Sequence, residues 1–216
     1  MSLYLTPMEP NKAVLTADIV NSTLMESKDL NDLILLIRSE FKKERVLFDF
    51  YRGDSFHALA GMEQALSLAL KLRVVARQMG TPENKSPDIR IAIGLGKVNE
   101  PVKSMAMGKG EAFVLSGREL DLIGKSTTHL SIRCSEQKID TGMEAVALLA
   151  DMVLKDVSPK QAEVLAELLV GATQMEVALK LRKSQSTVNE IAKAANWTML
   201  EKAIQIYRKL VLYIED

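Results

Sequence analysis

The chain has 216 residues, 47% of them hydrophobic, so it is long enough to bury a core and has room for two modest domains. One cysteine excludes an intramolecular disulfide, no apolar run is long enough for a bilayer span, and the first residues lack the layout of a secretion signal. The formal net charge is zero, so affinity for nucleic acid needs a local basic face. We expect a cytoplasmic protein without a membrane partner.

The first part of the chain predicts alternating strands and helices. Strands are indicated by buried apolar runs, the hairpin by Gly53-Asp54 at its tip, and the helices by apolar residues at helical spacing. The order is strand, helix, hairpin, helix, strand, helix and strand, at 12–20, 30–41, 46–51 with 55–60, 65–79, 88–93, 108–124 and 128–134. This order predicts an α/β sandwich with a mixed sheet.

Beyond residue 138 the pattern predicts helices alone, the last of them amphipathic over 203–214. We therefore predict an α/β domain over 1–138 and a small all-α domain over 139–216. Three helix starts carry the spacing of a capping box, namely Thr141 with Glu144, Ser158 with Gln161, and Thr173 with Glu176.

The segment 173–191 has the spacing of a helix-turn-helix. Ala178 supplies the small side chain needed where the two helices cross, and Ser184 can cap the second helix. The segment resembles bacterial helix-turn-helix regulators, although Arg182 replaces the usual turn glycine and Lys183 the usual apolar residue. The alternative is a compact helical module that pairs subunits or binds protein. The predicted DNA contacts are Arg182, Lys183, Ser184, Gln185, Ser186, Thr187, Asn189 and Lys193.

Two acidic residues mark the ends of predicted strands near the N-terminus. They lie in 17–23, Ala-Asp-Ile-Val-Asn-Ser-Thr, and in Gly53-Asp54. Both segments resemble the metal-binding strand ends of class III nucleotidyl cyclases. The resemblance implies that Asp18, Ile19 and Asp54 hold Mg²⁺ or Mn²⁺, and that the metal bridges them to a nucleoside triphosphate. Two close carboxylates without a cation repel each other, so a metal or a basic partner is required.

The cyclase resemblance extends over most of the first 125 residues. It includes 90–93 with Gly96, and the stretch 110–118, in which Arg118 aligns with the transition-state arginine. The amides of Gly108-Lys109-Gly110 can cradle a phosphate, or simply form a tight turn. The implied nucleotide-binding residues are Lys109, Gly110 and Arg118. Departures from the family are Phe50, Met107 and Val114, in place of a lysine, an aspartate and the catalytic asparagine.

Structural roles compete with these functional ones. Asp18 can cap the following helix, Asp54 suits a tight turn, and Arg118 can pair with a neighbouring acidic residue. His57 and His129 have no metal-ligand spacing, which favours packing or surface roles.

The whole arrangement resembles the SatD-like family of small bacterial proteins. We predict a homodimeric transcriptional regulator in which a cyclase-like domain, degenerate as an enzyme, senses a nucleotide and changes the geometry of a DNA-binding tail. One alternative is a metal-dependent nucleotide-processing enzyme that uses Asp18, Asp54 and Arg118. Another is an interaction scaffold without DNA binding.

Overall fold

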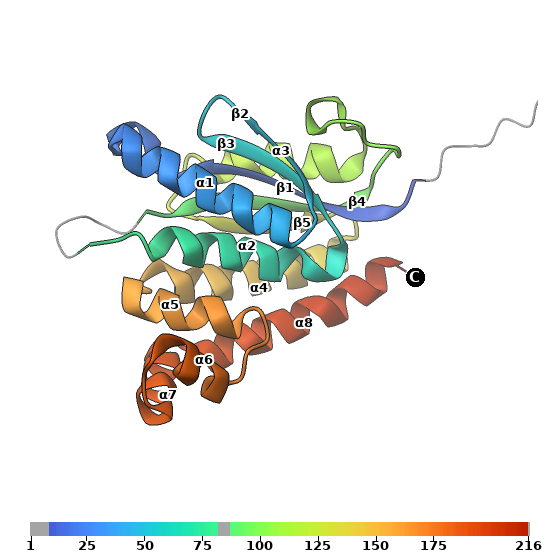
Figure 1. Ribbon diagram of the computed structural model, residues 1–216. Coiled ribbons are helices and arrows are strands. Elements are labelled where there is room, and N and C mark those ends of the chain that lie inside the picture. The colour runs from blue at the N-terminus through green and yellow to red at the C-terminus, as the bar shows by residue number, and fades with distance from the viewer. Residues whose placement is uncertain (1–8, 82–86, 216) are drawn as a thin grey trace, which may run out of the picture.

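The computed structural model describes residues 9–81 and 87–215, and its centre is a five-stranded sheet of order β2-β3-β1-β4-β5 (Figure 1). Only β4 and β5 pair in parallel; the other neighbours are antiparallel. This agrees with the predicted mixed sheet. The strands are β1 (Asn11–Ile19), β2 (Leu47–Tyr51), β3 (Ser55–Ala60), β4 (Ile89–Lys97) and β5 (Leu130–Cys134).

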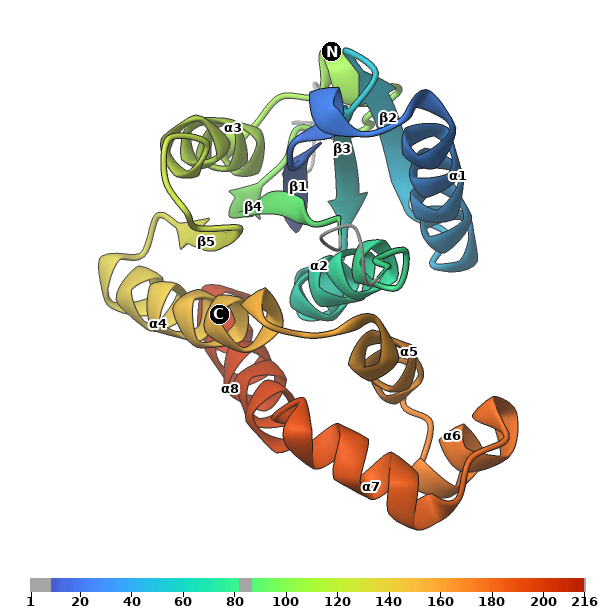
Figure 2. The same cartoon turned by 90° about the vertical axis from the view of Figure 1, so that its left-hand side faces the viewer.

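Helices cover both faces of the sheet. They are α1 (Ser27–Lys43), α2 (Met62–Arg77), α3 (Glu111–Ile123) and α4 (Gln137–Lys155), with short 3-10 turns η1 (Ser22–Leu24) and η2 (Met105–Met107). Figure 2 shows α3 on one face, and α1, α2 and α4 on the other. Alternation along β1 explains the two layers, because Leu15 and Ala17 enter the large core on the α1 and α2 side, whereas Val14 packs with Ala112 of α3.

The start of α4 differs from the sequence prediction. The helix begins at Gln137, and Thr141 lies inside it, where its Oγ1 donates to the carbonyl of Gln137 at 3.1 Å. The predicted capping box of Thr141 and Glu144 is therefore wrong. The hydroxyl of a threonine inside a helix can donate to the carbonyl four residues earlier. A threonine followed three residues later by a glutamate can therefore also lie in a helix interior.

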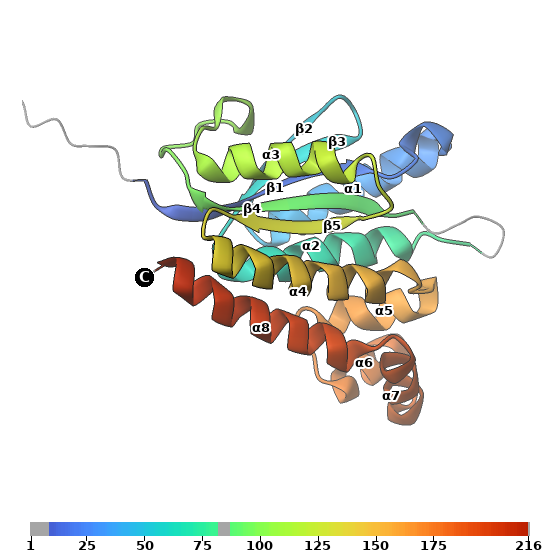
Figure 3. The same cartoon turned by 180° about the vertical axis from the view of Figure 1, so that it is seen from behind.

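The remaining helices continue from the sheet. They are α5 (Pro159–Leu168), α6 (Gln174–Leu181), α7 (Gln185–Ala194) and α8 (Trp197–Glu215). Figure 3 shows α4 and α8 side by side, and the large core extends through both helices. Tyr207 of α8 is fully buried, and its hydroxyl donates to the carbonyl of Met62 at 2.6 Å. The helices α5, α6 and α7 also enclose a small core of their own around Val164, Val177 and Val188.

These cores bear on the domain organisation. Because α4 and α8 share the large core with the sheet, a separate all-α domain is not confirmed. The boundary between residues 138 and 139 stays a prediction. Within the described ranges, no helix combines the length and apolar character that a bilayer crossing requires.

Candidate functional site

The sheet brings Asp18 and Asp54 to one edge. Asp18 lies opposite Ser55 in the pairing of β1 with β3, and the amide of Ile19 donates to the backbone carbonyl of Asp54 at 3.1 Å. Asp18 has the same strand parity as Thr16, whose hydroxyl donates to Ser116 of α3 at 2.8 Å, so it belongs to the α3 face. The two predicted metal carboxylates are therefore neighbours.

The cation at this edge is Arg90. Its Nη1 donates to both carboxylate oxygens of Asp18, at 2.9 and 3.1 Å, because the pairing of β1 with β4 sets the two residues opposite each other. Burial raises the pKa of Asp18, Arg90 opposes that rise, and the nearby Asp54 carboxylate adds to it. The sequence predicted that these two carboxylates need a metal or a basic partner, and in the structure Arg90 is a basic partner.

Asp54 is held by hydroxyl groups. Ser22, just after β1, donates to its Oδ2, and Ser55 donates to its Oδ1 at 3.1 Å. Tyr51 lies close by, and burial raises the pKa of its phenol, opposed by Arg52 and assisted by Asp18. Tyr51 also meets His57 edge to face at a centroid distance of 4.5 Å. Sequence spacing could not single out Tyr51, since its proximity depends on strand register.

These residues fit a metal ion poorly as they stand. Asp18 is committed to a guanidinium, and no cluster of three or more acidic, histidine or cysteine residues in the described part of the chain is arranged to hold a metal. A divalent cation next to Arg90 would meet like charge. Mg²⁺ or Mn²⁺ therefore stays a prediction, and no chemical step is derived through it.

The predicted phosphate-binding residues lie elsewhere. Gly110 bridges Val98 just beyond β4, at the end of the sheet where β1 begins. Asp18 is seven residues further along β1 than Asn11, or roughly 20 Å at the rise of a strand. Arg118 is exposed on α3. Within one chain, Lys109 and Gly110 do not meet the carboxylate pair.

Glycine at position 110 has a steric reason. It adopts φ of 129°, and a Cβ there would come within 2.4 Å of the carbonyl oxygen of Lys97. Close packing therefore explains this glycine without a bound phosphate.

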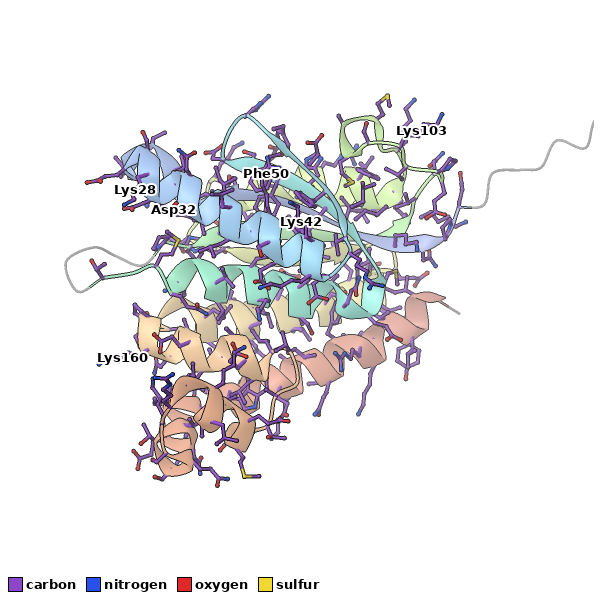
Figure 4. All side chains as sticks on the ribbon, viewed as in Figure 1. Lys28, Asp32, Lys42, Phe50, Lys103 and Lys160 are labelled. Atoms are coloured by element: carbon purple, nitrogen blue, oxygen red, sulfur yellow. The ribbon has the colours of Figure 1, made fainter. Side chains whose placement is uncertain are left out.

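Apolar side chains occupy the three positions that depart from the cyclase pattern. Phe50 lies on the α1 side of the sheet (Figure 4), under the guanidinium of Arg38 at 4.5 Å and beside Phe56, so it faces away from Asp18. Met107 and Val114 are exposed, by 67% and 48%. None of these three side chains offers the polar group that the cyclase family has at the corresponding position.

The helix caps predicted within the segment 173–191 are present. Thr173 and Glu176 form a reciprocal capping box at α6, and Ser184 accepts a hydrogen bond from the amide of Thr187 at the start of α7. Arg182 joins the two helices in the left-handed conformation, with φ of 52°, at the position where the usual motif has glycine. Of the predicted DNA contacts, all are exposed except Lys183, which is half-buried.

Two lysines, one in α6 and one in the turn that follows it, already form ion pairs. Lys180 contacts Glu167 of α5 at 2.7 Å, and Lys183 contacts Glu163 at 3.5 Å. Arg182 and Lys193 have no ion pair with the part of the chain that the structure describes. The positive charge available at this surface is therefore small.

A buried ionic cluster went unpredicted. Arg73 of α2, which is fully buried, contacts Asp88 at 2.8 Å and Asp151 of α4 at 2.7 Å, while Arg77 contacts Asp88 at 2.9 Å. His129 also lies here, with Nδ1 2.8 Å from Asp88, so its expected role in packing or at the surface was incomplete. Arg73 and Asp151 are 78 residues apart and Asp88 and His129 are 41 apart, so no local sequence pattern indicated these pairs.

Comparison with known proteins finds likeness in solved structures alone. No protein-family model and no curated protein matches the sequence. Similar solved structures include a dimeric guanylyl cyclase domain from the aquatic fungus Blastocladiella emersonii, with 22% identity over 61% of this chain and 82% of that one, and a TM-score of 0.47. The adenylyl cyclase CyaB from P. aeruginosa is 17% identical over 62% of this chain and 80% of that one, with a TM-score of 0.43. The likenesses to the SatD-like family and to helix-turn-helix regulators stay predictions.

Proposed function

We propose that the chain is a homodimeric transcriptional regulator that inserts α7 into DNA and whose α/β domain is no longer an active cyclase. The supporting observation is the start of α7, where Gln185, Ser186 and Asn189 are exposed on a helix that a separate three-helix core holds in place. Such a rigid, polar helix start suits contact with base edges in a major groove. The comparisons give no support to DNA binding, so the proposal rests on these helices.

The α/β domain supports the regulatory half of the proposal. Arg90 neutralises Asp18, and the side chain of Phe50 lies on the opposite face from the carboxylates. A site without the polar groups that orient a base and stabilise a transition state loses orders of magnitude in rate, yet its remaining groups can still bind. A ligand that binds unequally to two dimer geometries then shifts the affinity for DNA.

DNA binding is tested by fluorescence anisotropy on a duplex selected from a random library. We expect Asn189→Ala to lower affinity about 5- to 150-fold, the effect of losing one base contact worth about 1–3 kcal/mol. Lys193→Gln should reduce the salt dependence by about one phosphate contact. The control is Lys138→Gln, at the start of α4 and away from α7 (Figure 3). Absence of salt-dependent binding at low salt would leave the interaction scaffold as the better account.

A second candidate, nucleotide processing, is favoured by the convergence of Asp18 and Asp54 at one edge of the sheet. It requires that Arg90 release Asp18 to a metal. Incubation with nucleoside triphosphates and Mn²⁺ tests it, with Asp54→Ala as the inactive control. Failure to form any product, or equal product from Asp54→Ala, rejects catalysis at this edge.

A further inference from the structure

A cleft of about 450 Å³ lies where α2, the turn from α5 to α6, and α8 meet. Its volume falls within the range of small-molecule sites. The floor is apolar and buried, formed by Leu68, Leu168 and Ile204, and the rim is polar. This cleft is separate from the carboxylate edge, and no sequence motif pointed to it.

Lys71 is the one charged residue of the cleft lining that is not exposed. Its side chain is only 12% exposed, and its Nζ donates to the carbonyl of Ala166 at 2.8 Å. The carboxylate of Glu40 is 3.9 Å away, and its other oxygen contacts Lys43 at 2.6 Å. Burial lowers the pKa of Lys71, partly opposed by Glu40. An ammonium with three donors and one close acceptor has capacity left for an anion.

Trp197 supplies an aromatic wall near Lys71. The bond from Tyr207 to Met62 anchors α8 at the start of α2, and the two helices run in opposite directions (Figure 1). Trp197, ten residues before Tyr207, therefore lies about 15 Å further along, toward the Lys71 end of α2. Indole faces stack on planar rings.

The charges of the lining favour an acidic ligand. Glu44 and Glu201 also line the cleft, but both residues are exposed, so water screens their charge. Lys71 lies deeper, where charge is screened less. We propose that this cleft binds a small organic acid with a planar ring, the ring against Trp197 and the acidic group at Lys71. The proposal does not depend on DNA binding.

Trp197 is the only tryptophan of the chain, so its fluorescence reports on the cleft directly. The probe is 8-anilinonaphthalene-1-sulfonate, an aromatic anion with a planar naphthalene ring that accepts excitation energy from tryptophan. We expect saturable energy transfer from Trp197 in the full-length protein. Lys71→Met should raise the Kd about tenfold, as expected for a lost charge-assisted hydrogen bond.

Lys43→Met is the matched control, because it removes a charge beside the same Glu40 without touching the cleft. Its Kd should stay within about twofold of wild type, less than the loss expected for a charge-assisted bond. Ser67→Leu, a helix-compatible change on the α2 wall, should block binding even if Lys71→Met folds poorly. Absence of transfer in the wild type, equal effects of Lys71→Met and Lys43→Met, or unimpaired binding by Ser67→Leu would each overturn the proposal.

Discussion

At the scale of single residues, Arg90 determines the chemistry available to the carboxylate edge. Asp18 sits next to Asp54 in a half-buried position, and such a pair needs a neighbouring cation to stay ionised. Arg90 provides it through two contacts from one nitrogen. A guanidinium keeps its charge at any accessible pH, so the edge is neutralised without a metal.

Replacing Arg90 should convert this edge into a better metal site. In Arg90→Gln the two carboxylates lose their cation, so we expect millimolar Mn²⁺ to raise the Tm of this variant more than that of the wild type. Arg133→Gln, which removes another paired arginine of the same sheet, should behave like the wild type. A wild-type shift as large as that of Arg90→Gln would mean that Arg90 does not exclude the metal.

At the scale of elements, the turn between α6 and α7 shows a local conflict. The left-handed conformation of Arg182 costs an L-residue about 1–2 kcal/mol, although it lets α7 start in the correct direction. The caps at Thr173 and Ser184 stabilise the two helices on either side. The turn thus persists because its neighbours determine it.

Arg182→Gly should stabilise the protein by up to about 1 kcal/mol, because glycine adopts positive φ without strain but loses more entropy on folding. Urea unfolding measures the change. Arg182→Ala retains the Cβ and should give no gain. Equal stabilisation by both variants would assign the effect to the lost charge.

The buried ionic cluster around Asp88 ties α2 and α4 to the segments just before β4 and β5, and it should make stability sensitive to acid. Burial alone raises the pKa of Asp88, but Arg73, His129 and Arg77 outweigh it and hold that pKa below its usual value. The unfolded chain therefore takes up the proton more readily. The stabilisation is complete above the unfolded pKa of about 4 and is lost as pH falls toward the lower folded pKa.

Asp88→Asn should cost about 3–5 kcal/mol at neutral pH, because it leaves buried guanidinium charge uncompensated. It should also flatten the fall in stability below about pH 4. Urea unfolding across pH 2.5–7, chosen to bracket that pKa of about 4, measures both effects. The control is Asp156→Asn, which removes an exposed carboxylate. If Asp88→Asn leaves the acid sensitivity of stability unchanged, other carboxylates are responsible for it.

At the scale of the whole molecule, α4 and α8 connect the sheet to the three helices α5, α6 and α7. Both helices enter the large core. Arg77 of α2 donates at 3.3 Å to the carbonyl of Val157, which lies in the turn between α4 and α5. The outward faces of the same two helices carry exposed apolar residues, which can mark an interaction site. They are Leu149, Met152, Ile206 and Tyr213.

We predict that a second copy covers this face, as a regulator of paired DNA half-sites requires. Sedimentation equilibrium should give twice the chain mass of 23.9 kDa, and Met152→Glu should give a monomer. Leu122→Glu, equally exposed on α3, is the control. A monomeric wild type would contradict the homodimer, and dissociation by Leu122→Glu alone would move the interface to α3.

The sequence by itself determined the types and order of the elements. Hairpin strands predicted at 46–51 and 55–60 match β2 and β3 closely, and the caps at Ser158, Thr173 and Ser184 are confirmed. Apolar periodicity and capping are local, since they involve residues within about one turn or a few strand positions of each other.

Only the tertiary structure decided which distant residues meet. Strand register set Arg90 opposite Asp18, and packing gathered Arg73, Asp88 and Asp151. The bridge between Val98 and Gly110, at the other end of β1 and β4, keeps Lys109 away from Asp18 and Asp54, although the cyclase resemblance implied that all three serve one nucleotide. A shift of one residue along a strand moves a side chain to the other face, so site composition depends on a long-range alignment that local pattern does not encode.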